Sequence, residues 1–493
     1  MDLLAPRRFR AIAVPTALVT PFRRSRGTST EVSARGSSLL GRTGGHARRR
    51  AGFAATLALL AGLAAPAQAE EAEEEFDPWR GIDHDGRIPK VEKPAGLTNP
   101  DRWRYIPEGR IKPGHLLQRF LVSSFIAPFF FRDGDVGFGG GLAITDIDFR
   151  QQRRREFAGA FFSYTTRGQQ AYSAVWRRWL HHHDAPGGGI FQEERSFLRS
   201  TLGYEKSLTR RFFGFGADSK KRDESSYRDE TAFASFGGQR AFPNPGDDGV
   251  MSVSGRGEWH SLGSGKVRGR PDTRDAYPFT FAQARAHSLG WLELELRYDT
   301  RDSQILPYRG FDVGAKLDTA LLQSGWDVGA IFSLFGSKVL PVPPMLHDGG
   351  DSDEEHPPTD TIAVHLQTQV TVGDLPFFSL PTLGGSRTLR GFIAGRFRDR
   401  AMWHASAEYR FWVLPRGFPI PFTRTLRVER VGLALFGDVG SVEDDWGDLM
   451  GARVHASAGV GARVTLERTA PFRVDVGFSS DGVEVTAGFG LSF

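Results

Sequence analysis

The last eleven residues of this chain alternate strictly between apolar and polar side chains. From Val483 to Phe493 an apolar side chain occupies every second position, and glutamate, threonine, glycine and serine stand between them. A period of two is the pattern of a β-strand whose faces meet different surroundings. A soluble sheet edge ending on exposed aromatic residues would favour aggregation, whereas a membrane barrel turns such a face to lipid. We therefore predict that Phe489, Leu491 and Phe493 form the lipid-facing end of a closing strand.

The same alternation recurs through most of the chain. Fifteen segments carry it: 137–147, 156–166, 170–180, 196–207, 227–240, 249–261, 288–299, 310–321, 326–340, 361–372, 399–412, 428–438, 454–466, 472–479 and 483–493. Single-chain bacterial barrels use even numbers of strands, and Ala276–Arg285 supplies a weaker sixteenth. A large soluble β-sandwich is the alternative, but it would not need arginine and glutamate inside a closed shell. We predict an all-β fold, a transmembrane antiparallel β-barrel of sixteen strands over residues 137–493.

The N-terminal region carries the features of a secretory signal peptide. Arg48-Arg49-Arg50 precedes an apolar run, 51–65, and Ala67-Gln68-Ala69 supplies the small residues of a cleavage site. The alternative is a membrane anchor, but the run is short for a span of about 20 residues. We predict that residues 1–69 are a signal peptide with an extended basic n-region. Residues 70–136 are rich in proline and charge, which predicts a largely extended periplasmic tail and lead-in.

Composition removes several classes of function. The whole chain has a net charge of +5, but residues 1–69 hold 11 of its basic and two of its acidic residues. The mature chain is then slightly acidic, so nucleic-acid binding is not expected. The absence of cysteine excludes disulfides and thiolate metal sites. The chain also has no Gly-x-Ser-x-Gly elbow, so we predict no enzyme, no metal and no cofactor.

A distinctive motif lies between two predicted strands, in residues 373–398. Leu383-Gly384-Gly385 is followed by Leu389-Arg390-Gly391-Phe392. These residues resemble the long sixth extracellular loop of the BamA/TamA family of outer-membrane assembly barrels, also called the bacterial surface antigen family. The resemblance implies that this loop folds back into the lumen, with Arg390, Gly391 and Phe392 at its tip. It also implies a short member of the family, because residues 70–136 show no core for the periplasmic POTRA modules that assembly factors carry.

The resemblance also implies partners for Arg390. In that family the loop arginine contacts a Phe-x-Asp motif and a glutamate on two nearby strands, and Phe436, Asp438 and Glu408 stand at those positions. Alternation places all three on the lumen face independently. A guanidinium group offers a rigid fork of donors suited to carboxylates. The alternative is a solvated loop arginine opposite ordinary lumen carboxylates. Our hypothesis is a loop-anchoring cluster of Arg390, Gly391, Phe392, Glu408, Phe436 and Asp438.

Two functions follow from this interpretation. The first is a barrel that inserts or translocates proteins or lipids at the outer membrane, through the seam between its first and last strands. The second is a non-catalytic surface antigen or pore-like structural barrel without assembly activity. Both place the chain in the bacterial outer membrane, among its lipids. Both also require the cell's barrel-assembly machinery for insertion, and only the first requires protein or lipid clients.

Overall fold

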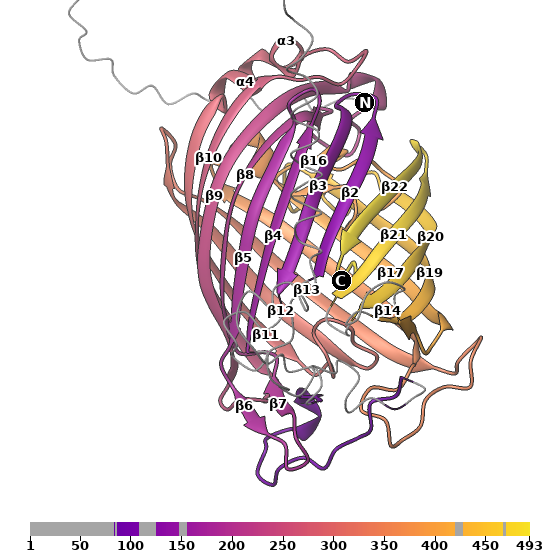
Figure 1. Cartoon of the computed structure of the whole chain (residues 1–493). Helices are drawn as coiled ribbons and strands as arrows, with labels where there is room; N and C mark the ends of the chain where they lie inside the picture. The colour runs from indigo at the N-terminus through magenta and orange to yellow at the C-terminus, as the bar shows by residue number, and fades with distance from the viewer. Residues whose placement is uncertain (1–82, 84–85, 108–124, 147–154, 420–426, 467–469) are drawn as a thin grey trace, which may run out of the picture. The chain divides into compact units, whose positions relative to one another are not determined.

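The structure is a computed structural model that describes residues 83, 86–107, 125–146, 155–419, 427–466 and 470–493. The predicted signal peptide lies outside these residues. Sixteen of the described strands form one antiparallel sheet that curves into a barrel (Figure 1). The predicted all-β fold and the predicted number of antiparallel strands, sixteen, are therefore confirmed, although one of the strands is not the one predicted.

The barrel strands follow one another around the wall in chain order. The first eight are β2 (Phe125–Asp133), β3 (Gly137–Asp146), β4 (Glu156–Thr165), β5 (Gln170–Trp179), β8 (Phe197–Phe212), β9 (Ser225–Phe242), β10 (Gly249–Ser264) and β11 (Ala286–Asp299). The second eight are β12 (Gly310–Gln323), β13 (Gly329–Val342), β14 (Asp360–Gly373), β17 (Ala401–Leu414), β19 (Arg427–Glu443), β20 (His455–Leu466), β21 (Ala470–Ser479) and β22 (Gly482–Phe489). Each is hydrogen-bonded to the next in antiparallel register.

Alternation along these strands separates an apolar outside from a polar inside. Leu296, Leu366 and Val485 are more than half exposed on the outer face. Inward positions carry charged side chains that are nearly inaccessible, such as Glu408 and Asp438. Among the described residues, none covers the apolar outer face, as expected of a surface that meets lipid.

The first strand of the barrel corrects two predictions. The barrel begins at β2, so residues 125–133 are wall and not lead-in, and the barrel does not start at 137. Pro128 interrupts the alternation, but proline is tolerated in an edge strand, and β2 is the first strand of the sheet. Phe129 and Phe131 pack over glycines of β3, Gly141 and Gly139, which have no side chains to compete for that space.

The predicted strand at Ala276–Arg285 is wrong. That segment contains two short helices, α3 (Thr273–Ala276) and α4 (Pro278–Gln283). Asp272 caps α3 by accepting a hydrogen bond from the backbone N–H of Arg274. Pro278 begins α4. Proline is favoured there because the first N–H groups of a helix have no acceptor within the helix. No helix in the described ranges has the length and apolar character of a membrane-spanning helix.

The remaining short elements precede the first wall strand or lie in the connections between wall strands. They are η1 (Pro100–Arg102), β1 (Trp103–Ile106), β6 (His182–Asp184), β7 (Ile190–Glu193), η4 (Lys221–Asp223), η5 (Phe377–Ser379), β15 (Thr382–Leu383), β16 (Phe397–Arg398) and β18 (Phe418–Pro419). We call the end of the barrel where β22 finishes the C-terminal mouth; it is the lower end in Figure 1. The connection from β14 to β17 leaves the wall at the opposite mouth.

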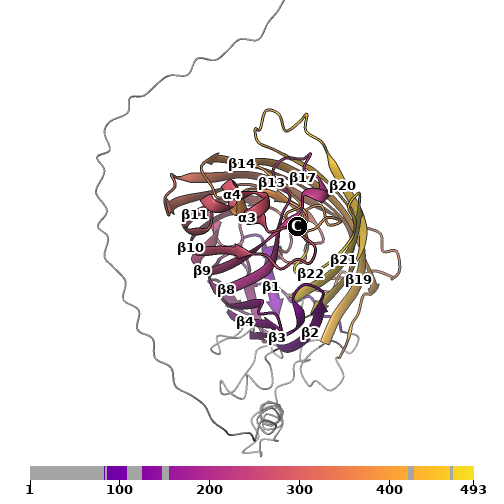
Figure 2. The same cartoon turned by 90° about the horizontal axis from the view of Figure 1, so that it is seen from above.

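A small folded cap lies at the C-terminal mouth. Strand β1 pairs with β7, and β7 pairs with β6, in a three-stranded sheet separate from the wall. Its apolar core contains Ile88, Trp103, Tyr105, Ala185 and Phe191. In the view along the barrel, β1 lies inside the ring of wall strands (Figure 2). Residues 86–107 are therefore packed, and the largely extended tail predicted for them is wrong. Their core could not be seen in the sequence because its other half comes from residues 185–191.

Candidate functional site

The connection between β14 and β17 folds into the barrel and carries its own apolar anchor. Strands β15 and β16 pair with each other inside it. Seven buried side chains from this loop, from the wall and from the connection between β8 and β9 form one cluster: Ala217, Leu383, Leu389, Phe392, Phe397, Met402 and Val442. Phe392 is 1% exposed. Phe392 therefore packs against the wall and fixes the position of Arg390, two residues earlier, along the barrel axis.

Arg390 is fully buried and binds Asp438 side-on. Its Nε and Nη2 donate to Oδ2 and Oδ1 of Asp438, each at 2.9 Å. The backbone N–H of Arg390 also donates to Oδ2, at 3.0 Å. Three hydrogen bonds therefore join the loop tip to β19. Breaking such a buried pair costs about 3–5 kcal/mol, because the remaining charge keeps its desolvation penalty.

Glu408 on β17 is shared by three arginines. Its Oε2 accepts from Nη1 of Arg390 at 2.5 Å. Its Oε1 accepts from Nε of Arg410 and from Nη2 of Arg463, both at 2.9 Å. Arg463 in turn donates to Asp475 at 2.7 Å. The loop arginine is thus one member of a charged network that crosses β17, β20 and β21.

Two further features fix the loop tip. The guanidinium carbon of Arg390 lies 3.6 Å from the centre of the Phe436 ring, a distance typical of a strong cation–π contact. Leu389 has φ 40°, in the left-handed region that non-glycine residues rarely adopt. Such strain costs about 1–3 kcal/mol and persists where surrounding contacts determine the backbone. At Leu389 those contacts are the buried apolar cluster on one side and the Arg390 network on the other.

Glycines allow the loop backbone to touch the wall. A Cβ at Gly391 would lie 2.7 Å from the carbonyl of Phe478, and a Cβ at Gly477 would lie 2.4 Å from the carbonyl oxygen of Arg390. Neither obstacle is a flexible side chain. Ser479 on β21 donates to the carbonyl oxygen of Gly391 at 2.6 Å. The Arg-Gly sequence therefore places the arginine in the network and lets the next backbone unit press against β21.

The end of the chain turns into the lumen, which corrects the face predicted for its last residue. Phe489 ends β22 and is 61% exposed, on the lipid side. Gly490 then adopts φ 79°, and this breaks the period of two. The Phe493 ring stacks on His365, an inward residue of β14, with 5.1 Å between ring centres. Phe493 therefore packs inside the barrel and does not belong to the apolar outer face.

The structure brings all six residues of the predicted cluster into one place. Sequence reasoning missed how far the network extends: Ser406 donates to Asp438 at 2.6 Å, and Ser492 donates to Glu408 at 3.0 Å. The period of two along β20 and β21 places Arg463, Arg473 and Asp475 on the inner face but does not show which of them meet. Register between strands decides that, and register is not visible in one strand's pattern. Among the described residues, no group of three or more side chains has the composition and spacing of a metal site.

Comparison with known proteins identifies the family of this barrel. The model of the Omp85 superfamily domain matches residues 191–493, more than half of the chain. A search of curated proteins finds no match.

Solved structures give more distant likenesses. The crystal structure of BamA from Haemophilus ducreyi lacking POTRA domains 1–3 is 16% identical, over 75% of this chain and 70% of that one, with a TM-score of 0.43. CdiB from Acinetobacter baumannii is 12% identical, over 74% of this chain and 58% of that one, with a TM-score of 0.40. CdiB from Escherichia coli is 10% identical, over 75% and 62%, with a TM-score of 0.46. The chain thus spans less than two thirds of either CdiB chain. On the family match, this chain belongs to the Omp85 superfamily, whose barrels are proteins of the bacterial outer membrane.

Proposed function

We propose that this barrel inserts or translocates proteins or lipids at the outer membrane, with the C-terminal mouth in the periplasm. Members of the Omp85 family are non-enzymatic transporters and assembly factors that work with outer-membrane components and protein clients. The observation that carries the proposal is the connection of Arg390 to both Glu408 and Asp438 inside the lumen. A passive surface or pore-like barrel would not require a loop that is fixed in the lumen by a buried charge network.

The seam between the first and last strands supports the same function. β2 and β22 lie beside each other in both views (Figures 1 and 2). In the described part of the chain, no ladder register joins them, whereas every other neighbouring pair of wall strands has one. A seam with few backbone hydrogen bonds opens at lower free energy than the rest of the wall. We propose that clients pass into the bilayer through the seam between β2 and β22. The Arg390 network keeps β17, β19, β20 and β21 in place while the seam is open.

A reconstitution experiment separates this function from a passive surface or pore-like barrel. The protein would be placed in lipid vesicles, and a urea-unfolded outer-membrane barrel would be added as client. We expect client folding, followed by heat-modifiable migration on gels, to be several-fold faster than in empty vesicles. Cysteine pairs scanned along β2 and β22 would lock the seam in a chain that has no cysteine of its own. Locking should return the rate to that of empty vesicles, and reduction should restore it. An unchanged rate with the unlocked protein would favour the passive barrel.

A further inference from the structure

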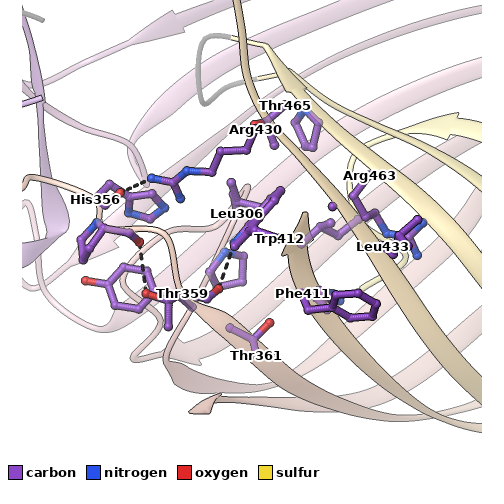
Figure 3. A pocket seen from close by; sticks show the side chains of 17 residues that line it. Leu306, His356, Thr359, Thr361, Phe411, Trp412, Arg430, Leu433, Arg463 and Thr465 are labelled. Carbon is purple, nitrogen blue, oxygen red and sulfur yellow. Dashed lines mark hydrogen bonds between the residues drawn. The ribbon is translucent and has the colours of Figure 1, made fainter. Parts of the chain in front are cut away.

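Two of the spaces along the barrel wall differ greatly in size. Inside the C-terminal mouth, side chains such as Leu306 and Trp412 surround a space of about 20 Å³ against β17, β19 and β20 (Figure 3). That space has room for about one water molecule. At the opposite mouth lies an open hollow of about 540 Å³ between Tyr164, Lys206 and Arg228, which we call the outer hollow. Of these two spaces, only the outer hollow can receive part of a ligand.

The outer hollow lies on the lipid-facing side of the wall. Its lining comes from the ends of β4, β5, β8 and β9 at the mouth opposite the C-terminal one, the upper end in Figure 1. Tyr164 is 55% exposed and shares the outer face of β4 with Phe162. Across the sheet, Tyr164 is opposite Gln170, and Gln170 is opposite Lys206. Residues directly opposite each other project to the same face of a sheet, so Lys206 also projects toward the membrane.

A row of outward aromatic side chains lies next to the outer hollow, nearer the middle of the barrel. Phe162, Tyr172 and Tyr204 are opposite one another on β4, β5 and β8, with ring centres 6.3 and 6.2 Å apart. Trp259 extends the row on β10. Aromatic girdles mark the boundary between the hydrocarbon and the headgroups of a bilayer. Side chains two residues further along each strand, about 7 Å away, therefore lie at the level of the lipid headgroups.

At that level, basic side chains gather without acidic ones. The outer hollow is lined by four cationic side chains and by no carboxylate: Arg167, Lys206, Arg228 and Lys266. None of the four forms an ion pair with a described residue. Arg167 donates to the backbone carbonyls of Gly134 and Asp135. Arg228 lies over Gly263, where a Cβ would be 2.5 Å from Nη2, and its buried Nε has no acceptor among the described residues. The hollow therefore presents cationic groups whose charge is not neutralised by its own walls.

Two carboxylates near the outer hollow reduce this charge but do not cancel it. Glu230, opposite Lys206 across the sheet, accepts a hydrogen bond from the hydroxyl of Tyr204 at 2.7 Å. Asp135 lies 3.7 Å from the guanidinium of Arg211. Counting both carboxylates against the four cations of the lining still leaves two positive charges.

The other acidic residues of β8 and of the same end of β9 do not change this balance. Glu205 forms its own ion pair with Arg210, at 2.9 Å. Asp229 lies on the opposite face of β9, where it contacts His260 in the lumen at 3.1 Å. The excess positive charge thus stays on the membrane side of the wall, where an anion from outside the chain can balance it.

We propose that the outer hollow binds a phosphate monoester on the headgroup of a membrane lipid. Such a group carries a charge of about −1.5 to −2, which matches the two positive charges that remain. Lys206 and Arg228 contact the phosphate, and the neighbouring aromatic row contacts the apolar chains of the same molecule. A soluble phosphate compound would use only the first of these features. The lipid belongs to the outer leaflet if the orientation under the proposed function holds, but binding itself depends neither on that orientation nor on client transport.

Native mass spectrometry of the full chain in detergent tests the site with three probes. Lipid A carries phosphate monoesters, its dephosphorylated form keeps the acyl chains, and inorganic phosphate has no chains. We expect lipid A to bind at least about fivefold more tightly than the dephosphorylated form, the contribution of one basic residue near an anionic headgroup. Equal binding of the two lipids would show acyl-chain contact alone and would overturn the proposal. Displacement of lipid A by an equal concentration of inorganic phosphate would indicate a soluble ligand and would also overturn it.

Substitutions then assign the binding to the outer hollow. Lys206→Gln and Arg228→Gln should each weaken lipid A binding about fivefold. Neither removes an ion pair within the chain, and binding of the dephosphorylated lipid should stay unchanged in both variants. Lys338→Gln is the matched control, because Lys338 is an exposed lysine on the outer face of β13 near the C-terminal mouth. The proposal is wrong if both hollow variants bind lipid A as tightly as Lys338→Gln, or if they lose the two lipids equally.

Discussion

Ser492 donates a hydrogen bond to Glu408 across 3.0 Å, and this contact joins the end of the closing strand to the middle of β17. Glu408 also binds Arg390, so the closing strand, the wall and the loop share one carboxylate. The end of β22 is thereby linked to the position of the loop. Displacing either one removes a partner from the other.

Arg390→Ala should leave Glu408 and Asp438 without their loop partner. We expect the free energy of unfolding to fall by about 3–5 kcal/mol, seen as a lower thermal midpoint in detergent. Asp438→Asn should act in the same direction with a smaller effect, and the double variant should be less than additive. Arg390→Lys should rescue only partly, because an ammonium group cannot form the fork. Arg387→Ala, at an exposed residue of the same loop, is the control. Full additivity would show that the two residues act independently.

Gly391→Ala should displace the loop without removing any charge. The added Cβ would meet the Phe478 backbone at 2.7 Å, and overpacking of this kind costs about 1–3 kcal/mol. The thermal midpoint and protease access to the loop would both report the change. Gly437→Ala, on β19, is a matched control because a Cβ there meets nothing within 4 Å. Equal midpoints for the two variants would contradict the close approach of the loop to β21.

The inward turn after Gly490 predicts different surroundings for two phenylalanine positions. In a chain without cysteine, Phe489→Cys and Phe493→Cys can each carry a fluorescent label. A quencher attached to lipid chains should quench the label at 489 strongly, because that side chain faces outward. The label at 493 should be quenched weakly, because that position contacts His365 inside the barrel. Comparable quenching at both sites would restore the lipid-facing position first predicted for Phe493.

Stability should depend on pH through Asp302, in the turn between β11 and β12. Burial raises the pKa of Asp302 from 3.8 to about 6, although backbone N–H groups of Tyr308 and Arg309 partly offset the shift. Between these values the folded chain binds more protons than the unfolded chain, so its stability falls as pH rises from about 4 to 6. We expect a loss of about 1–2 kcal/mol, after allowing for partial exposure. Asp302→Asn should flatten this part of the pH profile of the thermal midpoint, and Asp275→Asn, at an exposed residue, should leave it unchanged.

The N-terminal cap should protect its own segment from protease. Trp103 is 3% exposed in the cap core, so Lys90 and Arg102 should be cleaved slowly by trypsin in the folded protein. Trp103→Ala removes the largest apolar side chain of that core and should speed cleavage at these sites while the barrel stays intact. Trp446→Ala, at a half-exposed position, should not change the rate. Rapid cleavage at Lys90 in the unaltered protein would support the extended tail first predicted.

The sequence predicts what alternation and spacing can encode. Inward and outward faces follow from a period of two, which is why alternation alone places Glu408 and Asp438 correctly in the lumen. The prediction failed where local chemistry interrupts that period. Pro128 and the phenylalanines around it hid β2, and the positive φ of Gly490 redirected Phe493. Pro278 began a helix where the apolar spacing had suggested a strand.

Contacts between distant segments were also beyond the sequence. The cap core joins Ile88 to Phe191, and neither segment shows an apolar face large enough to predict a fold alone. Likewise, Arg463 meets Glu408 because β17, β19 and β20 align in one register, and Arg390 reaches the same carboxylate from the loop.

The two ends of the barrel are obstructed to different degrees. At the C-terminal mouth the obstruction is the cap, in which β1 is attached to β7. β1 is held by a register of four residue pairs and a small apolar core, beside a mouth with charged contacts such as Arg102–Asp248. The loop from the opposite mouth is held by fully buried ion pairs and is tethered to the wall at both of its ends. Unfastening the cap breaks the β1–β7 ladder and a few backbone hydrogen bonds between residues 88–90 and 353–355. Withdrawing the loop leaves several charges in the lumen without partners. Opening the cap at the C-terminal mouth would therefore cost less free energy than withdrawing the loop from the opposite mouth.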